Sequence, residues 1–346
     1  MTELTIPAVK RPLARKAVAL LSGGLDSTLA VKIIMDQGIE VLALTFLTYF
    51  GCDGESSCGH DTTTLAGKLG FKVKLCHLGH EYVEMVKNPK FGYGKNMNPC
   101  LDCRIMMISE AAKYMEAVGA SFIITGEVVG QRPMSQRRDT LNVSERESGL
   151  KGYILRPLSA KLLEPTIPEI EGTVDREKLY GISGRSRKIQ MELAEKYGIT
   201  DYPNAGGGCL LTDANYARKL KDLFKQIPTP SFTDLTLLKM GRHFRIHEEC
   251  RVMVGRHQTE NEFLAQLAEV GDYLFYVSDY KGPTTLVRGA MGEGDISIIA
   301  RITTRYSQAP SSGDVRVVYK KAGEEQGKEA WIEAGIDEMK LEALRI

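Results

Sequence analysis

A hexapeptide near the start of the chain, Ser-Gly-Gly-Leu-Asp-Ser at residues 22–27, has the composition of a phosphate-binding turn. It joins an apolar run at residues 17–21 to a helical pattern that begins at Thr28. The two glycines permit a sharp turn and a close approach of the backbone to a ligand. Backbone N–H groups, serine hydroxyls and the positive end of the helix would then face one point. The sequence therefore predicts a phosphate or pyrophosphate site at this turn.

Cysteines provide a second set of reactive groups. Cys100 and Cys103 form a Cys-x-x-Cys motif at the start of a helical pattern, and Cys209 directly follows three glycines. A Cys-x-x-Cys pair on its own is compatible with half of a zinc site, a redox dithiol or no function. Further potential ligands lie in a turn-rich segment: Cys52, Cys58 and His60. We expect that segment to be a movable lid, with an ancillary metal site as the alternative.

Alternating strands and helices must position these groups. Apolar runs predict buried strands at residues 17–21 and 39–47, and further strands are predicted at residues 71–77 and 121–125. Apolar residues at helical spacing predict helices at residues 28–37, 62–69, 81–86 and 105–118. This alternation is typical of an α/β fold with a doubly wound parallel sheet, which binds its ligand at the carboxyl ends of the strands. The hexapeptide follows such an end.

The composition limits the range of functions. The 346 residues include 45 basic and 44 acidic side chains, which excludes a highly cationic nucleic-acid coat protein but permits local basic patches. The first residues lack the apolar core of a secretory signal, and no run reaches membrane-spanning length. We therefore expect a cytoplasmic protein without a membrane partner, whose seven cysteines are reduced thiols, metal ligands or catalysts.

The second half of the chain has a different character. Prolines and polar residues at 227–234 predict a linker. Beyond it, strands at residues 251–254 and 273–277 and a helix at 259–268 predict a smaller α+β domain. The predicted organisation is a nucleotide-binding domain at residues 1–175, a helical cap at 176–230 and the α+β domain at 231–346. The cap would use helices at 188–197 and 214–224 to bring Cys209 to the Cys-x-x-Cys motif.

The hexapeptide resembles the PP-loop of the ATP pyrophosphatases, which split ATP into AMP and pyrophosphate to adenylate a carbonyl or amide oxygen. It lacks the Gly-Lys-Ser/Thr ending of a Walker A loop. The resemblance implies an adenine nucleotide alpha hydrolase-like domain with ATP and Mg²⁺ as cofactors. It also implies that Asp26 is catalytic and holds the magnesium ion. The ATP-binding residues would be Ser22, Gly23, Gly24, Asp26, Ser27, Gly126 and Gln131.

The segment at residues 124–136 narrows the resemblance to the 4-thiouridine synthetases of this superfamily. The matching residues are Gly126, Glu127, Gly130, Gln131, Ser135 and Gln136, with a later Arg156-Pro157-Leu158. Read physically, Gly126 would let a nucleotide approach the strand end, and Gln131 would offer it a donor and an acceptor. The resemblance implies thiolation of tRNA.

Several tRNA thiolases of this superfamily hold a [4Fe-4S] cluster with one Cys-x-x-Cys motif and one distant cysteine. The resemblance implies that Cys100, Cys103 and Cys209 are catalytic and ligate such a cluster, leaving one iron open to hydrosulfide. Persulfide or disulfide chemistry by the same cysteines, zinc, and no metal are the alternatives. The rhodanese domain of many 4-thiouridine synthetases has no counterpart here, so inorganic sulfide or a cysteine desulfurase is the expected sulfur donor.

Basic residues suggest where tRNA would bind. Arginine forms forked pairs with phosphate. The candidates in the first part of the chain are Arg132, Arg137, Arg138, Arg185, Arg187 and Lys188. From about Leu235 the sequence resembles the RNA-binding domain of NFACT proteins, although His257 replaces their usual asparagine. There the RNA-facing residues would be Arg256, Lys281 and Arg288, together with His257 and Asn261.

The sequence thus predicts an ATP-dependent tRNA thiolase that adenylates a uridine carbonyl oxygen and replaces it with sulfur, forming 4-thiouridine. One alternative is a PP-loop sulfur insertase or ligase that acts on a small molecule. The other is a non-catalytic RNA-binding factor whose nucleotide fold is a relic. The intact hexapeptide argues against the relic, and the second domain argues against a small-molecule substrate.

Overall fold

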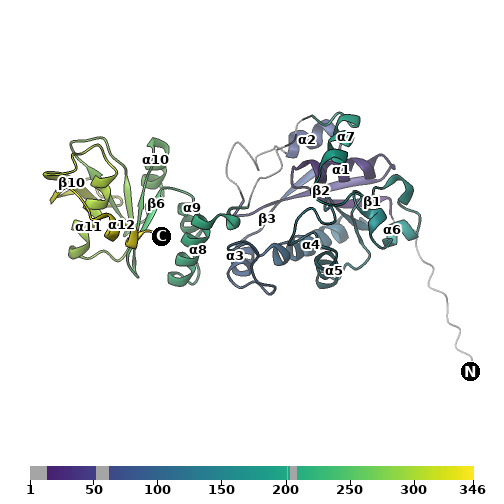
Figure 1. Cartoon of the computed structure of the whole chain (residues 1–346), viewed down its shortest axis with the longest axis horizontal. Helices are drawn as coiled ribbons and strands as arrows, with labels where there is room; N and C mark the ends of the chain where they lie inside the picture. Colours follow the sequence, from purple (N-terminus) through teal and green to yellow (C-terminus); the bar gives the residue numbers. More distant parts are fainter. Residues whose placement is uncertain (1–13, 52–61, 201, 203–208) are drawn as a thin grey trace, which may run out of the picture. The chain divides into compact units, whose positions relative to one another are not determined.

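The computed structural model describes residues 14–51, 62–200, 202 and 209–346. The chain divides into two compact units, residues Met1–Thr212 and Asp213–Ile346, and each is described by itself (Figure 1). Cys52, Cys58 and His60, and with them the predicted lid, lie outside the described residues. None of the helices in the described ranges has the length and hydropathy needed to cross a membrane.

The first unit is built on a parallel sheet with the strand order β3-β2-β1-β4-β5. Its strands are β1 (Lys16–Leu20), β2 (Glu40–Leu47), β3 (Lys72–His77), β4 (Phe122–Thr125) and β5 (Ile154–Leu155). Its helices are α1 (Leu25–Met35), α2 (Thr62–Leu69), α3 (His80–Lys87), α4 (Cys100–Ala117), α5 (Arg138–Glu147), α6 (Ile167–Ile170) and α7 (Lys188–Lys196). The predicted doubly wound α/β fold is confirmed.

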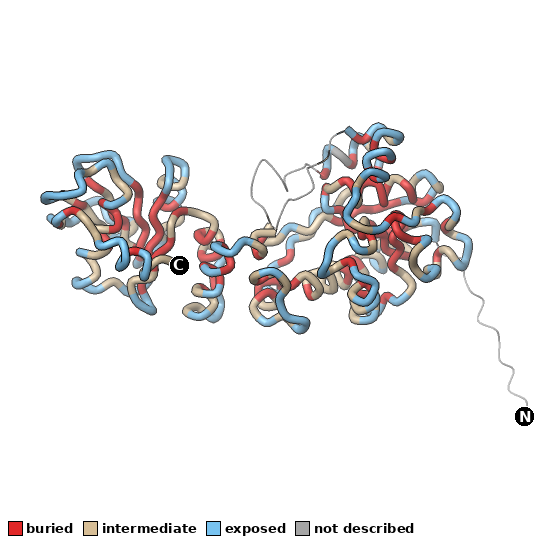
Figure 2. Tube along the Cα trace, viewed as in Figure 1, coloured by how far each residue is buried: buried red, intermediate tan, exposed pale blue. Residues whose placement is uncertain are grey.

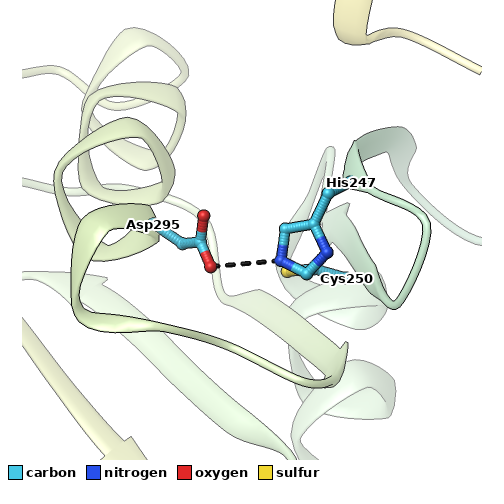
Figure 3. A group of neighbouring side chains, drawn as sticks. All are labelled: His247, Cys250 and Asp295. Atoms are coloured by element: carbon cyan, nitrogen blue, oxygen red, sulfur yellow. Dashed lines mark hydrogen bonds and ion pairs between the residues drawn. The ribbon is translucent and has the colours of Figure 1, made fainter.

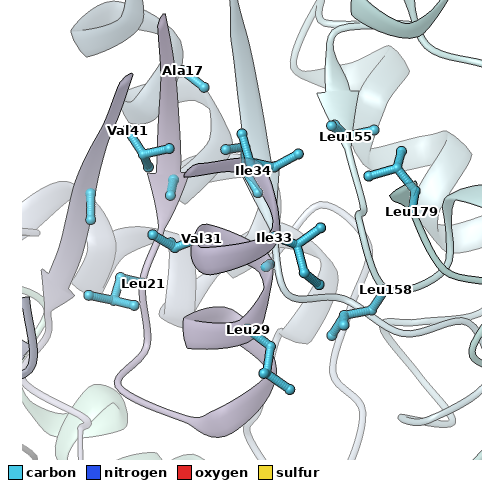
Figure 4. Close-up of a cluster of buried hydrophobic side chains, with 14 of the residues drawn as sticks. Ala17, Leu21, Leu29, Val31, Ile33, Ile34, Val41, Leu155, Leu158 and Leu179 are labelled. Carbon is cyan, nitrogen blue, oxygen red and sulfur yellow. The ribbon is translucent and has the colours of Figure 1, made fainter. Parts of the chain in front are cut away.

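Helices cover both faces of this sheet. Alternate residues of β1 point to opposite faces, so they pack in two different cores. Ala17 and Leu21 pack with α1 and α7 in one core (Figure 4), whereas Val18 and Leu20 pack against α4 in another. Figure 1 shows α1, α2 and α7 on one side of the sheet and α3, α4 and α5 on the other. The residues of β1 are consequently buried on both faces (Figure 2), as the continuous apolar run predicts.

The second unit contains a six-stranded antiparallel sheet with the order β11-β10-β8-β9-β7-β6. Its strands are β6 (Arg242–His247), β7 (Cys250–Val254), β8 (Tyr273–Val277), β9 (Thr285–Gly289), β10 (Asp314–Lys321) and β11 (Lys328–Glu333). Its helices are α8 (Ala214–Gln226), α9 (Phe232–Leu237), α10 (Gln258–Gln266), α11 (Glu293–Arg305) and α12 (Glu338–Leu344). One face of the sheet packs against α11 and α12, and the other against α9 and α10. This agrees with the predicted α+β domain.

The boundary between the units lies earlier than the predicted linker. Helix α7 belongs to the first unit, where it packs on α1, whereas α8 belongs to the second. Two interactions hold α8 there: Lys219 Nζ donates to the Leu238 carbonyl oxygen at 2.5 Å, and Asp222 pairs with Arg245. The two helices of the predicted cap are therefore divided between the units.

Candidate active site

The Ser22–Ser27 turn is cross-linked by its own side chains. Ser27 Oγ donates to the Gly24 carbonyl oxygen at 2.8 Å and lies 3.1 Å from Ser22 Oγ. Thr28 Oγ1 donates to the same carbonyl oxygen at 3.1 Å. Gly23 has a φ of 75°, in the left-handed region that favours glycine. These contacts fix the shape of the loop, and no side chain of the described residues caps the first amides of α1.

The turn lies at the point where the strand order reverses. β1 pairs with β2 on one side and with β4 on the other, so the loops after β1 and β4 meet at the carboxyl edge. A Cβ atom on Gly126, just after β4, would lie 2.4 Å from Ser27 N and 2.6 Å from Asp26 C. The sequence predicts that Gly126 contacts a nucleotide, and the structure shows that the absence of a side chain at Gly126 permits close packing against the first loop.

The Asp26 carboxylate is the centre of a polar cluster. Gln131 Nε2 donates to Asp26 Oδ2 at 2.8 Å, and Arg187 Nη2 lies 3.9 Å from the same oxygen. Gln190 Nε2 in turn donates to Gln131 Oε1 at 3.5 Å. The structure therefore shows Gln131 and Arg187 in contact with Asp26, whereas the sequence assigned one to the nucleotide and the other to RNA.

Helix α7 reaches this cluster through a paired loop. Val129 forms a bridge with Ser183, and Gly184 N donates to the Val129 carbonyl oxygen at 2.8 Å. The Ser159 hydroxyl joins the same loops, since it accepts from Val129 N at 3.0 Å and donates to the Ile182 carbonyl oxygen at 2.6 Å. The segment after β4 and the start of α7 are thus held together.

Three buried polar atoms of the cluster have no hydrogen-bond partner among the described residues: Asp26 Oδ1, Arg187 Nε and Gln190 Oε1. An unpaired buried polar atom costs about 1–3 kcal/mol, so native sites pair such atoms with water or a ligand. A carboxylate oxygen suits a hard cation such as Mg²⁺, and a guanidinium N–H suits a phosphate. The cluster therefore fits Mg²⁺ and a polyphosphate.

The Cys-x-x-Cys motif occupies the first turn of α4. Asp102 anchors this turn by accepting the backbone N–H of Lys90 at 2.8 Å and that of Phe91 at 3.1 Å. The Tyr82 hydroxyl lies 3.2 Å from Cys103 Sγ. Burial raises the pKa of both thiols, and Arg104 opposes this rise. Without a bound cation, both cysteines are protonated thiols near pH 7.

Cys209 lies beside the same tyrosine. Its Sγ donates to the Phe50 carbonyl oxygen at 3.6 Å, and the Phe50 and Tyr82 rings are 5.9 Å apart between centroids. The following turn contacts the segment before Cys100, since Met97 N donates to the Leu211 carbonyl oxygen at 3.1 Å. The fold of the first unit therefore brings the distant cysteine to the neighbourhood of the motif without the predicted cap.

The three thiols do not form a compact single-ion site. Among the described residues, the one group of three potential ligands lying within 4.8 Å of one another does not include them. A tetrahedral zinc ion with Zn–S bonds of about 2.3 Å would hold its sulfurs within about 4 Å. As they stand, the three thiols therefore do not fit a single zinc ion.

A buried ion network links the motif to the end of β4. Glu127 pairs with Arg104, next to Cys103, at 3.1 Å and with Arg156 at 3.0 Å, and it accepts the Thr125 hydroxyl at 3.0 Å. Burial alone would raise the pKa of Glu127, but the two arginines hold that pKa below its ordinary value. The network ties the cysteine helix to the edge that carries Gly126 and Gln131.

The remaining predicted RNA contacts differ in exposure. The exposed ones are Arg132, Arg137, Arg138, Arg185, Lys188, Arg256 and Lys281. The prediction that Arg288 faces RNA is corrected by the structure. The Arg288 side chain is only 12% exposed and pairs with Asp272 at 2.7 Å and with Asp234 at 3.2 Å. These carboxylates hold it inside the second unit and away from an open RNA surface.

Sequence reasoning missed Tyr82, Arg104 and Gln190. Arg104 directly follows the second motif cysteine, and Gln190 is a wholly buried amide three residues after Arg187. A polar residue at the core-facing position of a helix is a signal that was available in the sequence. Tyr82 gave no such signal, because a tyrosine in an apolar helix pattern is usual.

Two family models match the chain. Residues 13–164 match the family described as Thiamine biosynthesis protein (ThiI), and residues 241–339 match the NFACT protein RNA binding domain. These segments contain, respectively, the Ser22–Ser27 turn with the Cys-x-x-Cys motif and all the strands of the antiparallel sheet.

Curated relatives are tRNA-specific 2-thiouridylases MnmA. The protein of Symbiobacterium thermophilum is 24% identical over 61% of this chain and 56% of its own length. That of Pseudomonas putida W619 is 25% identical over 79% of this chain and 71% of its own length. The chain thus spans little more than half of the first relative.

Among solved structures, a 4-thiouridine synthetase in complex with RNA and ATP is similar at 22% identity. The match covers 65% of this chain and 52% of the synthetase chain, with a TM-score of 0.38. Residues 13–164 of the first unit are thus similar to the ThiI proteins, and residues 241–339 of the second unit are similar to the NFACT RNA-binding domains.

Proposed function

We propose that the chain is an ATP-dependent tRNA thiolase that adenylates a uridine carbonyl oxygen and then replaces it with sulfur. The observation that carries this proposal is the cluster around Asp26, beside the rigid Ser22–Ser27 turn. It presents a carboxylate oxygen and a guanidinium N–H that have no hydrogen-bond partner within the described part of the chain. The motif cysteines are tied to the same edge of the sheet through Arg104 and Glu127.

The first step uses the residues of the turn. Ser22, Ser27 and the amides of Gly23 and Gly24 bind the β- and γ-phosphates, while Asp26 holds Mg²⁺. The uridine oxygen attacks the α-phosphate, the bond to the β-phosphate breaks, and pyrophosphate leaves. Because a carbonyl oxygen is a poor leaving group, its conversion into an AMP ester makes the base carbon electrophilic. Charge neutralisation and positioning are the protein's contribution.

The second step needs sulfur near that carbon. We assign Cys100, Cys103 and Cys209 to a [4Fe-4S] cluster, since they are half-buried and too widely spaced for one zinc ion. When bound, such a cluster would supply an iron site that could activate sulfide. A sulfur nucleophile attacks the carbon, and AMP departs with the former carbonyl oxygen. The sulfur comes from inorganic sulfide or a cysteine desulfurase.

Either of two carbonyl groups of the uridine base could receive the sulfur. The ThiI match and the segment at residues 124–136 favour 4-thiouridine, which is our first choice. The names of the curated relatives favour 2-thiouridine, in which the other carbonyl oxygen of the same base is exchanged. Both reactions use the same adenylation chemistry, so the protein residues named above keep their roles in either case.

The second unit is assigned to tRNA binding. Its exposed cations, Arg256 and Lys281, would contact phosphates, and a structured RNA would be read by its shape. In this proposal the chain consists of an adenylation unit, residues Met1–Thr212, followed by an RNA-binding unit, residues Asp213–Ile346.

Pyrophosphate release tests this proposal. Purified chain with Mg²⁺, ATP and bulk tRNA should release pyrophosphate faster than without tRNA, and Asp26→Asn should lose most of that release. A matched control is Asp279→Asn, which changes an exposed carboxylate of the second unit. Release without any response to tRNA would indicate a small-molecule substrate, and no release would indicate a non-catalytic RNA-binding protein.

A further inference from the structure

A group of three potential metal ligands lies in the second unit, on elements that the proposed thiolation does not use. His247 ends β6, Cys250 begins β7 and Asp295 lies in the first turn of α11 (Figure 3). One ligand atom from each side chain lies within 4.8 Å of the other two. His247 Nε2 is 3.2 Å from Asp295 Oδ2.

The fold holds these side chains together. His247 and Cys250 are directly opposite each other across the β6–β7 hairpin, so their side chains leave the same face of the sheet. A register shift between Arg245 and His247 accompanies this pairing and turns the end of the strand. Asp295 is fixed above them because its Oδ2 also accepts Gly292 N at 2.8 Å.

The donor set is the mixture that Zn²⁺ prefers. An imidazole nitrogen, a thiolate sulfur and a carboxylate oxygen are all common zinc ligands. A thiolate and a carboxylate together carry two negative charges, which match a divalent cation. His247 is 43% exposed in its side chain, whereas Cys250 is fully buried. Solvent can therefore reach the site from the histidine side and fill a fourth position.

We propose that His247, Cys250 and Asp295 bind one zinc ion, with a water molecule as the fourth ligand. The ion replaces the hydrogen bond between His247 and Asp295 and links the β6–β7 hairpin to α11. This inference does not depend on the thiolase proposal, because it concerns the second unit alone.

Two alternative roles for these side chains have weaker support. Asp295 caps α11, but that role uses the Gly292 amide and requires neither the histidine nor the thiol. A nucleophilic Cys–His–Asp triad needs a thiol that a substrate can reach. Cys250 is 0% exposed, so it cannot attack an external substrate. A metal site uses all three side chains where they stand.

The test measures zinc binding by the full chain. A background variant with Cys52, Cys58, Cys100, Cys103 and Cys209 changed to Ser and His60 changed to Ala removes the other candidate metal ligands named above. In this background we expect one Zn²⁺ per chain by competition with a chromophoric chelator, and Zn²⁺ should raise the unfolding temperature. Co²⁺ should give a thiolate-to-metal absorption band. His247→Ala should weaken Zn²⁺ binding by at least about tenfold, and Cys250→Ser should abolish the Co²⁺ band.

His80→Ala is the matched control, because His80 is also exposed and pairs with a carboxylate, Glu84, at 3.5 Å, with no thiol beside it in this pair. It should leave zinc binding unchanged. His247 lies at the surface, so His247→Ala keeps the test valid if Cys250→Ser fails to fold. Zinc binding that His247→Ala leaves unchanged, or no zinc binding at all in the background variant, would overturn the proposal.

Discussion

Gln131 donates a hydrogen bond to Asp26 at 2.8 Å across 105 residues of sequence. The bond joins the loop after β4 to the loop after β1 at the edge where the strand order reverses. It also fixes which oxygen of the carboxylate remains available, because Oδ2 accepts the amide while Oδ1 has no partner among the described residues. The bond thus orients the Asp26 carboxylate so that Oδ1 is available to a cation.

Replacing Gln131 by glutamate should therefore weaken ATP binding. The substitution keeps the shape of the side chain but sets a second carboxylate beside Asp26. Losing a hydrogen bond to a charged group costs about 1.5–3 kcal/mol, or about 10- to 150-fold in affinity. Calorimetric titration with Mg²⁺ and ATP measures this change. Gln258→Glu adds the same charge in the second unit and should leave the affinity unchanged; equal losses in both variants would refute the assigned role of Gln131.

Gly126→Ala should disrupt the phosphate-binding turn. The new methyl group would meet the backbone of Asp26 and Ser27 at 2.4–2.6 Å, so one of the two loops must move. A misplacement of about 1 Å can cost about 100-fold in rate, and we expect a loss of that order in pyrophosphate release. Gly67→Ala is the control, because its Cβ would meet nothing within 4 Å. Normal release by Gly126→Ala would contradict the close packing.

Glu127→Gln should destabilise the first unit in a pH-dependent way. Arg104 and Arg156 hold the pKa of Glu127 below its ordinary value, so the carboxylate stabilises the fold above about pH 4.3. This stabilisation is lost as the pH falls through the lowered pKa. Removing one partner of a buried pair costs about 3–5 kcal/mol near neutrality.

Denaturant unfolding of both proteins between neutral and acidic pH measures this difference in the free energy of unfolding. The difference should be largest near pH 7 and shrink at the acidic end. Glu177→Gln removes an exposed carboxylate that pairs with Lys161 at 3.0 Å, and it should cost at most about 1 kcal/mol. A difference between native and Glu127→Gln proteins that stays constant with pH would show that charge is not the cause.

Arg288 and Lys281 should respond differently to substitution. Arg288→Gln leaves Asp234 and Asp272 without their shared partner, so the second unit should lose stability. Lys281→Gln should leave stability unchanged but weaken tRNA binding and lower its salt slope by about 1. Thermal unfolding and fluorescence anisotropy with bulk tRNA separate the two effects. A stable Arg288→Gln variant with weakened RNA binding would restore Arg288 to the RNA surface.

Much of the first unit was predictable because it depends on local patterns. The strands β1, β2 and β4 are rich in apolar residues, and the glycine-rich turn between β1 and α1 has a specific residue order. Three of the first unit's elements named above escaped prediction. β5 contains two residues and α6 four, too few to form a pattern, and α5 is largely polar and buries only Leu141 and Ser144.

The partners of charged side chains were not predictable in the same way. Arg288 reads as a surface cation in sequence, yet its carboxylates lie 16 and 54 residues away, at Asp272 and Asp234. Arg187 likewise reads as a phosphate contact at a helix start, and only the pairing of the loops around Val129 and Ser183 brings it to Asp26. Such contacts follow from strand order and loop packing, which a single sequence does not specify.

The most direct test of the thiolase account is nucleoside analysis of the tRNA itself. Unmodified tRNA, Mg²⁺, ATP and sulfide are incubated anaerobically with iron-reconstituted chain, and the digested nucleosides are separated and weighed by mass spectrometry. The account predicts one thiouridine for each AMP formed, identified as 4-thiouridine by its retention time, and its loss in Asp26→Asn and Cys209→Ser. AMP formation without any sulfur in the tRNA, or thiolation that survives Cys209→Ser, would contradict it.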